Sequence, residues 1–109
     1  MRVLQVGLGR FGQSHLRSWR KLAVDLRVCD RDHSRLAALA EPCSTDWRAL
    51  LDDVECVDVA TSASSHEEIA RAALERGKHV LVEKPITPSA REGFALAALA
   101  RERGRVLQV

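Results

Sequence analysis

The apolar residues of this chain repeat with two periods that alternate along the sequence. Short apolar runs, typical of buried strands, are followed by longer stretches in which apolar residues recur every three or four positions, as on one face of a helix. The expected strands are residues 2–6, 26–29, 57–60, 79–82 and 106–109, with a short, weak one around Cys43. Strands that alternate with helices pair in parallel through right-handed crossovers. The pattern therefore predicts an α/β fold with a doubly wound parallel sheet.

Capping and helix-stopping residues mark where the helices between these strands begin and end. The expected helices are residues 11–21, residues 32–40, a stretch from Thr45 or Asp46 that carries Trp47, Leu50 and Leu51, a stretch from Ser64 or Ser65 to Gly77, and a stretch from Ser89 to Gly104. Asp32 and Ser89 are of the type that caps helix N-termini, and Ser89 is followed by Glu92 at capping-box spacing. Pro42 and Gly77 are typical helix stops.

The size and composition of the chain predict one globular domain, residues 1–109, with a single apolar core. Hydrophobic residues make up 46% of the chain and charged residues 29%, the balance of a folded domain rather than a disordered one. The longest apolar run, residues 94–100, is shorter than the roughly 18 residues of a membrane span. A formal net charge of +2 gives no case for nucleic-acid binding. We therefore expect no membrane or nucleic-acid partner.

The three cysteines predict reduced thiols rather than a metal site. Cys29, Cys43 and Cys56 are odd in number and lack the closely paired spacing of zinc ligands. The N-terminal segment also lacks the uninterrupted apolar core of a signal peptide, because Arg10 and three glycines lie within it. Both observations favour a cytoplasmic protein.

A glycine-rich turn follows the first expected strand and leads directly into a helix. It reads Gly7-Leu8-Gly9-Arg10-Phe11-Gly12, the G-x-G-x-x-G spacing of dinucleotide-binding domains. Gly7 permits a tight turn, Gly9 lets the backbone approach a diphosphate, and Gly12 lets the helix pack close to the sheet. The N–H groups at the start of the helix would receive the phosphate charge. All six residues are therefore predicted to form the cofactor-binding loop of a Rossmann-like domain.

An acidic residue at the end of the second strand strengthens this interpretation. Asp30 lies 18 residues beyond Gly12, close to the roughly 20-residue spacing of the acid that binds the adenosine ribose. A carboxylate there accepts hydrogen bonds from the ribose hydroxyls and repels a 2′-phosphate, which favours NAD. Arg31 follows immediately and is able to pair with that phosphate, so NADP stays open as the cofactor.

The tripeptide Glu83-Lys84-Pro85 ends the strand that begins at His79. A lysine at a strand end beside a nicotinamide can serve as a general acid or base, because a proton must accompany hydride transfer to a carbonyl. Pro85 keeps Lys84 out of the helical region and stiffens its backbone. A solvated loop lysine would carry the same sequence, so these residues alone leave both interpretations open.

Four motifs together resemble those of the Gfo/Idh/MocA oxidoreductase family. They are the glycine-rich turn at residues 7–12, the stretch Val57-Asp58-Val59-Ala60-Thr61 with His66 following, Gly77-Lys78-His79-Val80, and Glu83-Lys84-Pro85. The resemblance covers nearly the whole chain and only the N-terminal, NAD(P)-binding domain of the family. It implies an NAD(P)-dependent oxidoreductase that acts on sugars, inositols or sugar nucleotides.

The resemblance also implies roles for individual residues. Lys84 would be the catalytic residue, which assists proton transfer or substrate binding near the nicotinamide, while Glu83 and Pro85 would shape the nicotinamide pocket. Thr61 and Ser62 would line the cofactor, although the family usually has Pro and Asn where this chain has Ser62 and Ala63. His66, beside that loop, is a further candidate for cofactor binding. His15 and His79 are expected to be structural.

In the family a second domain supplies most substrate contacts, further acid–base residues and the oligomer interface. We therefore expect this chain to bind substrate, to form a homo-oligomer and to catalyse turnover only together with such a domain.

Two other functions fit the same residues. The glycine-rich turn also resembles that of non-enzymatic nucleotide-sensing domains attached to potassium channels and transporters, which use a bound nucleotide to bias a conformation. A catalytically silent, truncated relative that only binds cofactor is the other alternative.

Overall fold

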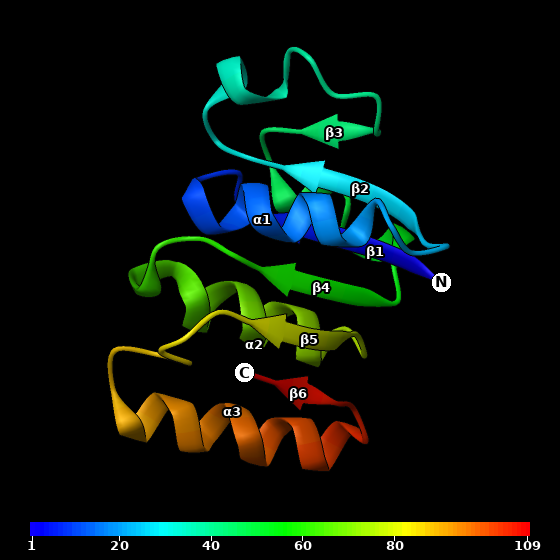
Figure 1. Ribbon diagram of the computed structural model, residues 1–109. Coiled ribbons are helices and arrows are strands. Elements are labelled where there is room, and N and C mark those ends of the chain that lie inside the picture. The colour runs from blue at the N-terminus through cyan, green and yellow to red at the C-terminus, as the bar shows by residue number, and fades with distance from the viewer.

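The six strands form one parallel sheet, which the computed structural model describes over all 109 residues (Figure 1). The strands are β1 (Arg2–Val6), β2 (Asp25–Cys29), β3 (Cys43–Ser44), β4 (Cys56–Val59), β5 (His79–Val82) and β6 (Leu107–Gln108), in the spatial order β3-β2-β1-β4-β5-β6. The order reverses between β1 and β4, which is the switch point at which doubly wound sheets bind ligands. The predicted Rossmann-like sheet is therefore confirmed.

Helices cover the two faces of the sheet and enclose two apolar clusters. Helix α1 (Arg10–Trp19) packs on one face, where Leu16 meets Val3 and Val28. Helices α2 (His66–Glu75) and α3 (Ala90–Arg103) pack together on the other face, where Leu74 and Leu96 belong to a larger cluster. Their apolar faces recur with the helical period that the sequence displays. None of these helices has the length and apolar content needed to span a bilayer.

The predicted helix over residues 32–40 is wrong. Asp32 does cap a helical turn, because its side chain accepts a hydrogen bond from Ser34 N, but the turn is a 3₁₀ helix of four residues, His33–Leu36. Leu36 is the one buried residue of that turn. A multi-turn helix requires a longer apolar face to stabilise it, since short helices are marginal in isolation.

Two further helical predictions need correction. The stretch after Asp46 forms two 3₁₀ turns, Trp47–Ala49 and Leu51–Asp53, rather than one helix. A 3₁₀ turn, Ala63–Ser65, also precedes α2, and Ser65 makes no side-chain capping bond there. By contrast Ser89 caps α3 as predicted, with its hydroxyl accepting from Glu92 N, and Gly104 ends that helix with a positive φ of 64°.

Candidate functional site

A cavity of about 970 Å³ opens at the carboxyl ends of the strands. Its walls come from the loops after β1, β2, β4 and β5 and from the 3₁₀ turn at Trp47. Of the residues predicted to form the site, the cavity is lined by Gly7, Gly9, Arg10, Phe11, Asp30, Arg31, Thr61, Ser62, Glu83 and Lys84. The volume lies in the range of cofactor and ligand pockets.

Four predicted residues do not line the cavity: Leu8, Gly12, His66 and Pro85. Leu8 is 2% exposed and belongs to the apolar cluster under α1, so its side chain packs into the core. Gly12 is buried at the point where α1 meets the loop after β1. These two residues pack on the protein side of the loop and do not face the cavity.

The glycines of the loop after β1 differ in what surrounds them. Gly7 has a φ of +109°, and a Cβ atom there would lie 2.4 Å from Ala60 O. A Cβ atom on Gly12 would lie 2.2 Å from Gly7 O. Around Gly9, by contrast, the nearest atom to such a Cβ is Arg35 Nη1 at 3.8 Å, and Gly9 faces the cavity. Space outside Gly9 is therefore free for a ligand, while Gly7 and Gly12 hold the loop closed against the protein.

The start of α1 offers hydrogen-bond donors to this space. Gly9 is the N-cap residue, no side chain caps the helix, and no acidic residue lies in its first turn. The first N–H groups of a helix have no partner within the helix, and the helix dipole favours a negative charge beside them. A phosphate at the open face of Gly9 would meet these donors.

Gln5 of β1 supports the same loop from below, and the sequence analysis missed it. Its amide nitrogen donates to Gly7 O at 2.9 Å and to Gly12 O at 2.7 Å, and the side chain is fully buried. The signal in the sequence is a polar residue among the apolar residues 3–6 of the strand. The two hydrogen bonds of this amide should keep the loop in place, because a buried donor without a partner is costly in free energy.

Asp30 sits at the end of β2 with its carboxylate in the cavity wall. One oxygen accepts from Leu8 N at 2.8 Å and the other from Asp32 N at 2.8 Å, while Arg35 Nη1 lies 3.4 Å away. The carboxylate thus joins the glycine-rich loop to β2. A carboxylate has about four acceptor positions, so it retains capacity for a ribose hydroxyl.

Basic and aromatic residues that no sequence motif marks also line the cavity. They are Arg35, Trp47 and Arg48. The guanidinium of Arg48 lies 4.1 Å from the centre of the Trp47 ring and also pairs with Glu68. With Arg31, three guanidinium groups line this cavity, and Arg35 is the one in contact with the Asp30 carboxylate. No motif marks the 3₁₀ turn that carries Trp47 and Arg48.

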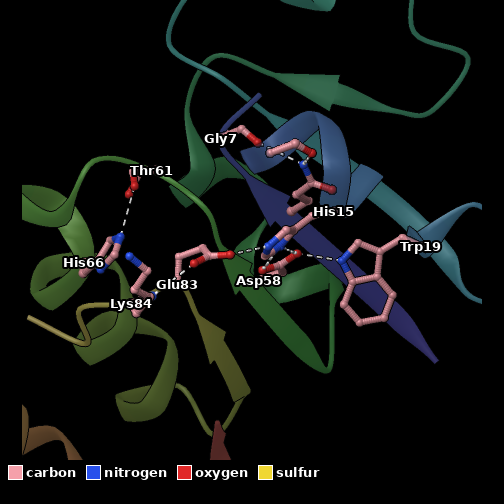
Figure 2. A network of polar contacts seen from close by, with 10 residues as sticks. Gly7, His15, Trp19, Asp58, Thr61, His66, Glu83 and Lys84 are labelled. Atoms are coloured by element: carbon pink, nitrogen blue, oxygen red, sulfur yellow. Dashed lines mark hydrogen bonds and ion pairs between the residues drawn. The ribbon is translucent and has the colours of Figure 1, made fainter. Parts of the chain in front are cut away.

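His66 connects two loops instead of facing the cavity. Its Nδ1 lies 2.8 Å from Pro85 O and its Nε2 lies 3.0 Å from Thr61 O, and the side chain is buried (Figure 2). His66 therefore supports the loops after β4 and β5, and its contact with a cofactor stays a prediction. Thr61 and Ser62 of the first loop do line the cavity, where Thr61 Oγ1 accepts from Ser65 Oγ at 2.7 Å.

Lys84 is exposed, with Glu83 beside it in the cavity wall. Backbone pairing fixes this segment, because Glu83 N donates to Val59 O at 2.9 Å. The Lys84–Pro85 peptide bond is cis. Lys84 and Asp30 line one cavity from β5 and β2, which lie three strand spacings apart, about 14 Å.

A chain of polar contacts runs from the core of the sheet to Glu83 (Figure 2). Asp58 of β4 is fully buried and accepts from Trp19 Nε1 at 2.6 Å, and its oxygens lie 2.8 and 3.0 Å from His15 Nδ1. The other ring nitrogen, Nε2, lies 2.8 Å from Glu83 Oε1. A structural role was predicted for His15, and the sequence indicates no separate role for Asp58. His79 is structural as predicted, since its Nδ1 accepts from Val106 N at 3.0 Å.

Burial and the contacts of this network shift the pKa values of Asp58, His15 and Glu83. Burial raises the pKa of Asp58, and hydrogen bonds from Trp19 and His15 oppose that effect only in part. Burial alone would lower the pKa of His15, but the carboxylates of Asp58 and Glu83 outweigh it and raise the value. The His15 hydrogen bond is the main reason that the pKa of Glu83 is lowered. Both carboxylates thus favour the protonated form of the His15 imidazole.

Comparison with known proteins identifies the domain. The family model described as the oxidoreductase family with an NAD-binding Rossmann fold matches residues 1–109. The chain belongs to the Gfo/Idh/MocA oxidoreductase family. It is the NAD-binding Rossmann domain of that family, as the sequence motifs indicated.

Individual members of the Gfo/Idh/MocA family match the whole chain. UDP-N-acetylglucosamine 3-dehydrogenase of Acidithiobacillus ferrooxidans is 33% identical over 115 residues, which cover 100% of this chain and 36% of that protein. Levoglucosan dehydrogenase of Pseudarthrobacter phenanthrenivorans is 33% identical over 129 residues, with 100% of this chain and 33% of that protein covered. The chain thus spans about a third of the length of the relatives it matches.

Solved structures of the family share the fold. The structure of biliverdin reductase of Synechocystis sp. PCC 6803 with biliverdin and NADP+ superimposes with a TM-score of 0.91 at 30% identity, covering 99% of this chain and 37% of that one. The neighbours of this Gfo/Idh/MocA domain therefore include an NADP+ complex, while the family model is described by NAD binding. The chain is an NAD(P)-binding domain.

Proposed function

We propose that this chain is the cofactor-binding half of an oxidoreductase that transfers a hydride between a nicotinamide cofactor and a sugar or sugar-like substrate. The observation that carries the proposal is the open face of Gly9, which shares one cavity with the carboxylate of Asp30 and the amine of Lys84. A dinucleotide needs a phosphate site flanked by a ribose site and a nicotinamide site. The cavity offers a group of suitable chemistry for each.

The residues present fit the cofactor in a defined direction. Asp30 would bind the adenosine ribose, and the open face of Gly9 with the first N–H groups of α1 would hold the diphosphate. The nicotinamide half would then lie across the switch point, toward Thr61, Glu83 and Lys84. When bound, the nicotinamide ring supplies the site that accepts or donates the hydride.

Lys84 is the proposed catalytic residue of this domain. Its exposed side chain stands on the β5 side of the cavity, where a substrate hydroxyl or carbonyl would approach the nicotinamide. The ammonium group is suited to hold or release the proton that accompanies the hydride, and to orient the substrate oxygen. Glu83 and Pro85 would shape the pocket around it, with Glu83 in the cavity wall.

The substrate class rests on the relatives. Two of them are named for a sugar nucleotide and for levoglucosan, and both are about three times as long as this chain. We infer that a second domain supplies most substrate contacts and the interface of a homo-oligomer. The exposed apolar side chains of Val106 and Val109, 60% and 55% exposed, offer surface for such contacts. The three free thiols fit a cytoplasmic location.

The wall near Asp30 suggests that NAD is preferred and NADP accepted. The Asp30 carboxylate repels a 2′-phosphate, but three guanidinium groups, those of Arg31, Arg35 and Arg48, line the same cavity. Arginine pairs with phosphate through two parallel hydrogen bonds. The balance between the Asp30 carboxylate and these three guanidinium groups is expected to give a modest preference for NAD rather than exclusion of NADP.

Calorimetric titration of the chain with NAD+, NADH and NADP+ tests cofactor binding. Binding is expected below about 1 mM, the upper end of ordinary cofactor and substrate constants. A folded sample that binds none of the three at that concentration would remove the proposal.

The role of Lys84 is tested by Lys84→Ala, with Lys21→Ala at the far end of α1 as the matched control. NAD+ binding should persist in both variants. With the domain joined to a substrate domain, Lys84→Ala should lower turnover about 100-fold or more, the usual contribution of a general acid–base group. Equal turnover in the two variants would contradict the catalytic role of Lys84, and cofactor binding with no turnover in the unmodified protein would favour a non-enzymatic nucleotide sensor.

A further inference from the structure

His15 connects the two parts of the site that the cofactor must span. The residue belongs to α1, whose first N–H groups form the proposed phosphate site, and its Nε2 lies 2.8 Å from Glu83 in the segment after β5. The second oxygen of Glu83 accepts from Lys84 N at 3.2 Å. An unbroken series of contacts therefore leads from the phosphate helix through His15 and Glu83 to the backbone of Lys84 (Figure 2).

A purely structural role explains the contact of His15 Nδ1 with Asp58 but not the contact of Nε2 with Glu83. The buried carboxylate of Asp58 receives hydrogen bonds from Trp19 Nε1 and from His15 Nδ1, which meets its need for partners. The contact of Nε2 with Glu83 adds nothing to that need. Glu83 is partly exposed, with 26% of its side chain accessible, and water would otherwise solvate it. The second contact thus orders a side chain that burial alone would leave mobile.

The charges around His15 determine which atom donates in its contact with Glu83. The groups that face the imidazole are Asp58 from β4 and Glu83 from the segment after β5, with Lys84 next to Glu83. Carboxylates only accept hydrogen bonds, so both ring nitrogens donate when the ring is protonated. The raised pKa of His15 and the lowered pKa of Glu83 both follow from this arrangement. Glu83 is thereby held ionised, with one oxygen fixed on His15.

We propose that His15 is a positioning residue, which is anchored by Asp58 and fixes Glu83, and through Glu83 the backbone of Lys84, at the nicotinamide end of the cavity. This inference rests on the proposed function, because it assigns the loop after β5 to the nicotinamide. Preorganised groups lose less conformational freedom on binding, so the ordered loop should favour the cofactor half that it contacts. The adenosine and diphosphate contacts, which lie on β1 and β2, should not depend on it.

Two substitutions separate the two sides of the imidazole. In His15→Asn the shorter amide takes the place of Nδ1 and reaches Asp58 but not Glu83. In His15→Gln the longer amide takes the place of Nε2 and reaches Glu83. A positioning role predicts that the Gln variant stays closer to the unmodified chain, whereas a purely structural role predicts the same of the Asn variant. His33→Gln, at an exposed site outside the cavity, is the matched control.

The variants are compared by calorimetric binding of NAD+ and of ADP-ribose, which lacks the nicotinamide. His15→Asn should weaken NAD+ binding about fivefold or more and change ADP-ribose binding less than about twofold, with a smaller effect of His15→Gln on NAD+. Equal losses for both ligands, or a larger loss in the Gln variant, would overturn the positioning role. Failure of ADP-ribose to bind the unmodified chain would count against the proposed function itself.

A second readout does not need the cofactor. The backbone amide of Lys84, followed by NMR between about pH 5 and 9, should shift with the same midpoint as the His15 ring in the unmodified chain and in the His33→Gln control. That shift should disappear in His15→Asn, because the imidazole whose titration acts through Glu83 is no longer there. A Lys84 amide that ignores the titration of His15 in the unmodified chain would overturn the proposal, whatever the ligands do.

Discussion

A Cβ atom on Gly12 would lie 2.2 Å from the carbonyl oxygen of Gly7. The first turn of α1 and the loop after β1 are thus in contact through their backbones. The same Gly7 carbonyl also accepts from the amide of Gln5 at 2.9 Å, which limits how far it is able to move aside. This contact sets the position of the helix start relative to the sheet.

The first prediction follows from that contact and concerns stability. Gly12→Ala should lower the free energy of unfolding by about 2 kcal/mol, the usual cost of forcing extra volume into a closely packed site. Ser14→Ala, exposed on the same helix, should change it by less than about 0.5 kcal/mol. Urea denaturation followed by tryptophan fluorescence measures both. Equal stabilities in the two variants would mean that the loop opens more easily than its contacts indicate.

Gly9→Ala is predicted to change stability little and to weaken NAD+ binding. Space around Gly9 is open and its φ of −70° suits alanine, so stability should fall by less than about 1 kcal/mol, the cost of an alanine at an N-cap. The new methyl group would project into the proposed diphosphate site and should raise the Kd for NAD+ at least about tenfold. Titration and denaturation of the same sample measure both effects. Undiminished NAD+ binding would place the diphosphate elsewhere in the cavity.

The fold and the glycine-rich loop could be predicted because local patterns determine them. Strand and helix periods appear within short windows, and the spacing of the three glycines and Asp30 follows from one turn, one helix and one strand. The helix expected over residues 32–40 was wrong because the length of a helix depends on packing against the rest of the protein, which a local pattern does not show. Local capping by Asp32 favoured a helix. Leu36 is the one buried residue of the turn that forms, which is too little burial to extend it.

The rest of the site depends on contacts between distant segments, which no local pattern reports. His15 and Asp58 are 43 residues apart in sequence, and His15 and Glu83 are 68 apart. Trp47 and Arg48 reach the cavity on a short 3₁₀ turn without a motif. His66 was read as a cofactor contact because it lies beside the right loop, and only the fold shows that its ring connects Thr61 O with Pro85 O.

Asp30→Asn should shift the cofactor preference toward NADP+. The substitution removes the charge that repels a 2′-phosphate while Arg31, Arg35 and Arg48 stay in place. We expect weaker NAD+ binding and a change of about tenfold in the ratio of the two Kd values in favour of NADP+. Titrations at low ionic strength are suited to measure it, since salt screens the arginines. Asp53→Asn, whose side chain is exposed and outside the cavity, is the control and should leave the ratio unchanged.

The last prediction concerns the dependence of stability on pH. The pKa of His15 is raised above its usual 6.5 in the folded chain, so the folded state holds the imidazole proton more tightly than the unfolded state does. The resulting stabilisation is fully present below pH 6.5 and is lost as pH rises through the raised value. Glu83 acts at the other end of the scale, since its lowered pKa gives a stabilisation that is lost only on acidification below its ordinary 4.5.

The free energy of unfolding should therefore decrease more steeply from pH 6.5 to about pH 8.5 in the unmodified chain than in His15→Gln. Burial raises the pKa of Cys29 to about 12 and of Cys56 to about 11, from an ordinary 9.0, so the two thiols add a decrease near the upper end of this interval that is the same in every variant. Denaturant unfolding at closely spaced pH values gives the slope. His33→Gln should keep the slope of the unmodified chain. An unchanged slope in His15→Gln would show that the imidazole between Asp58 and Glu83 does not hold its proton more tightly on folding.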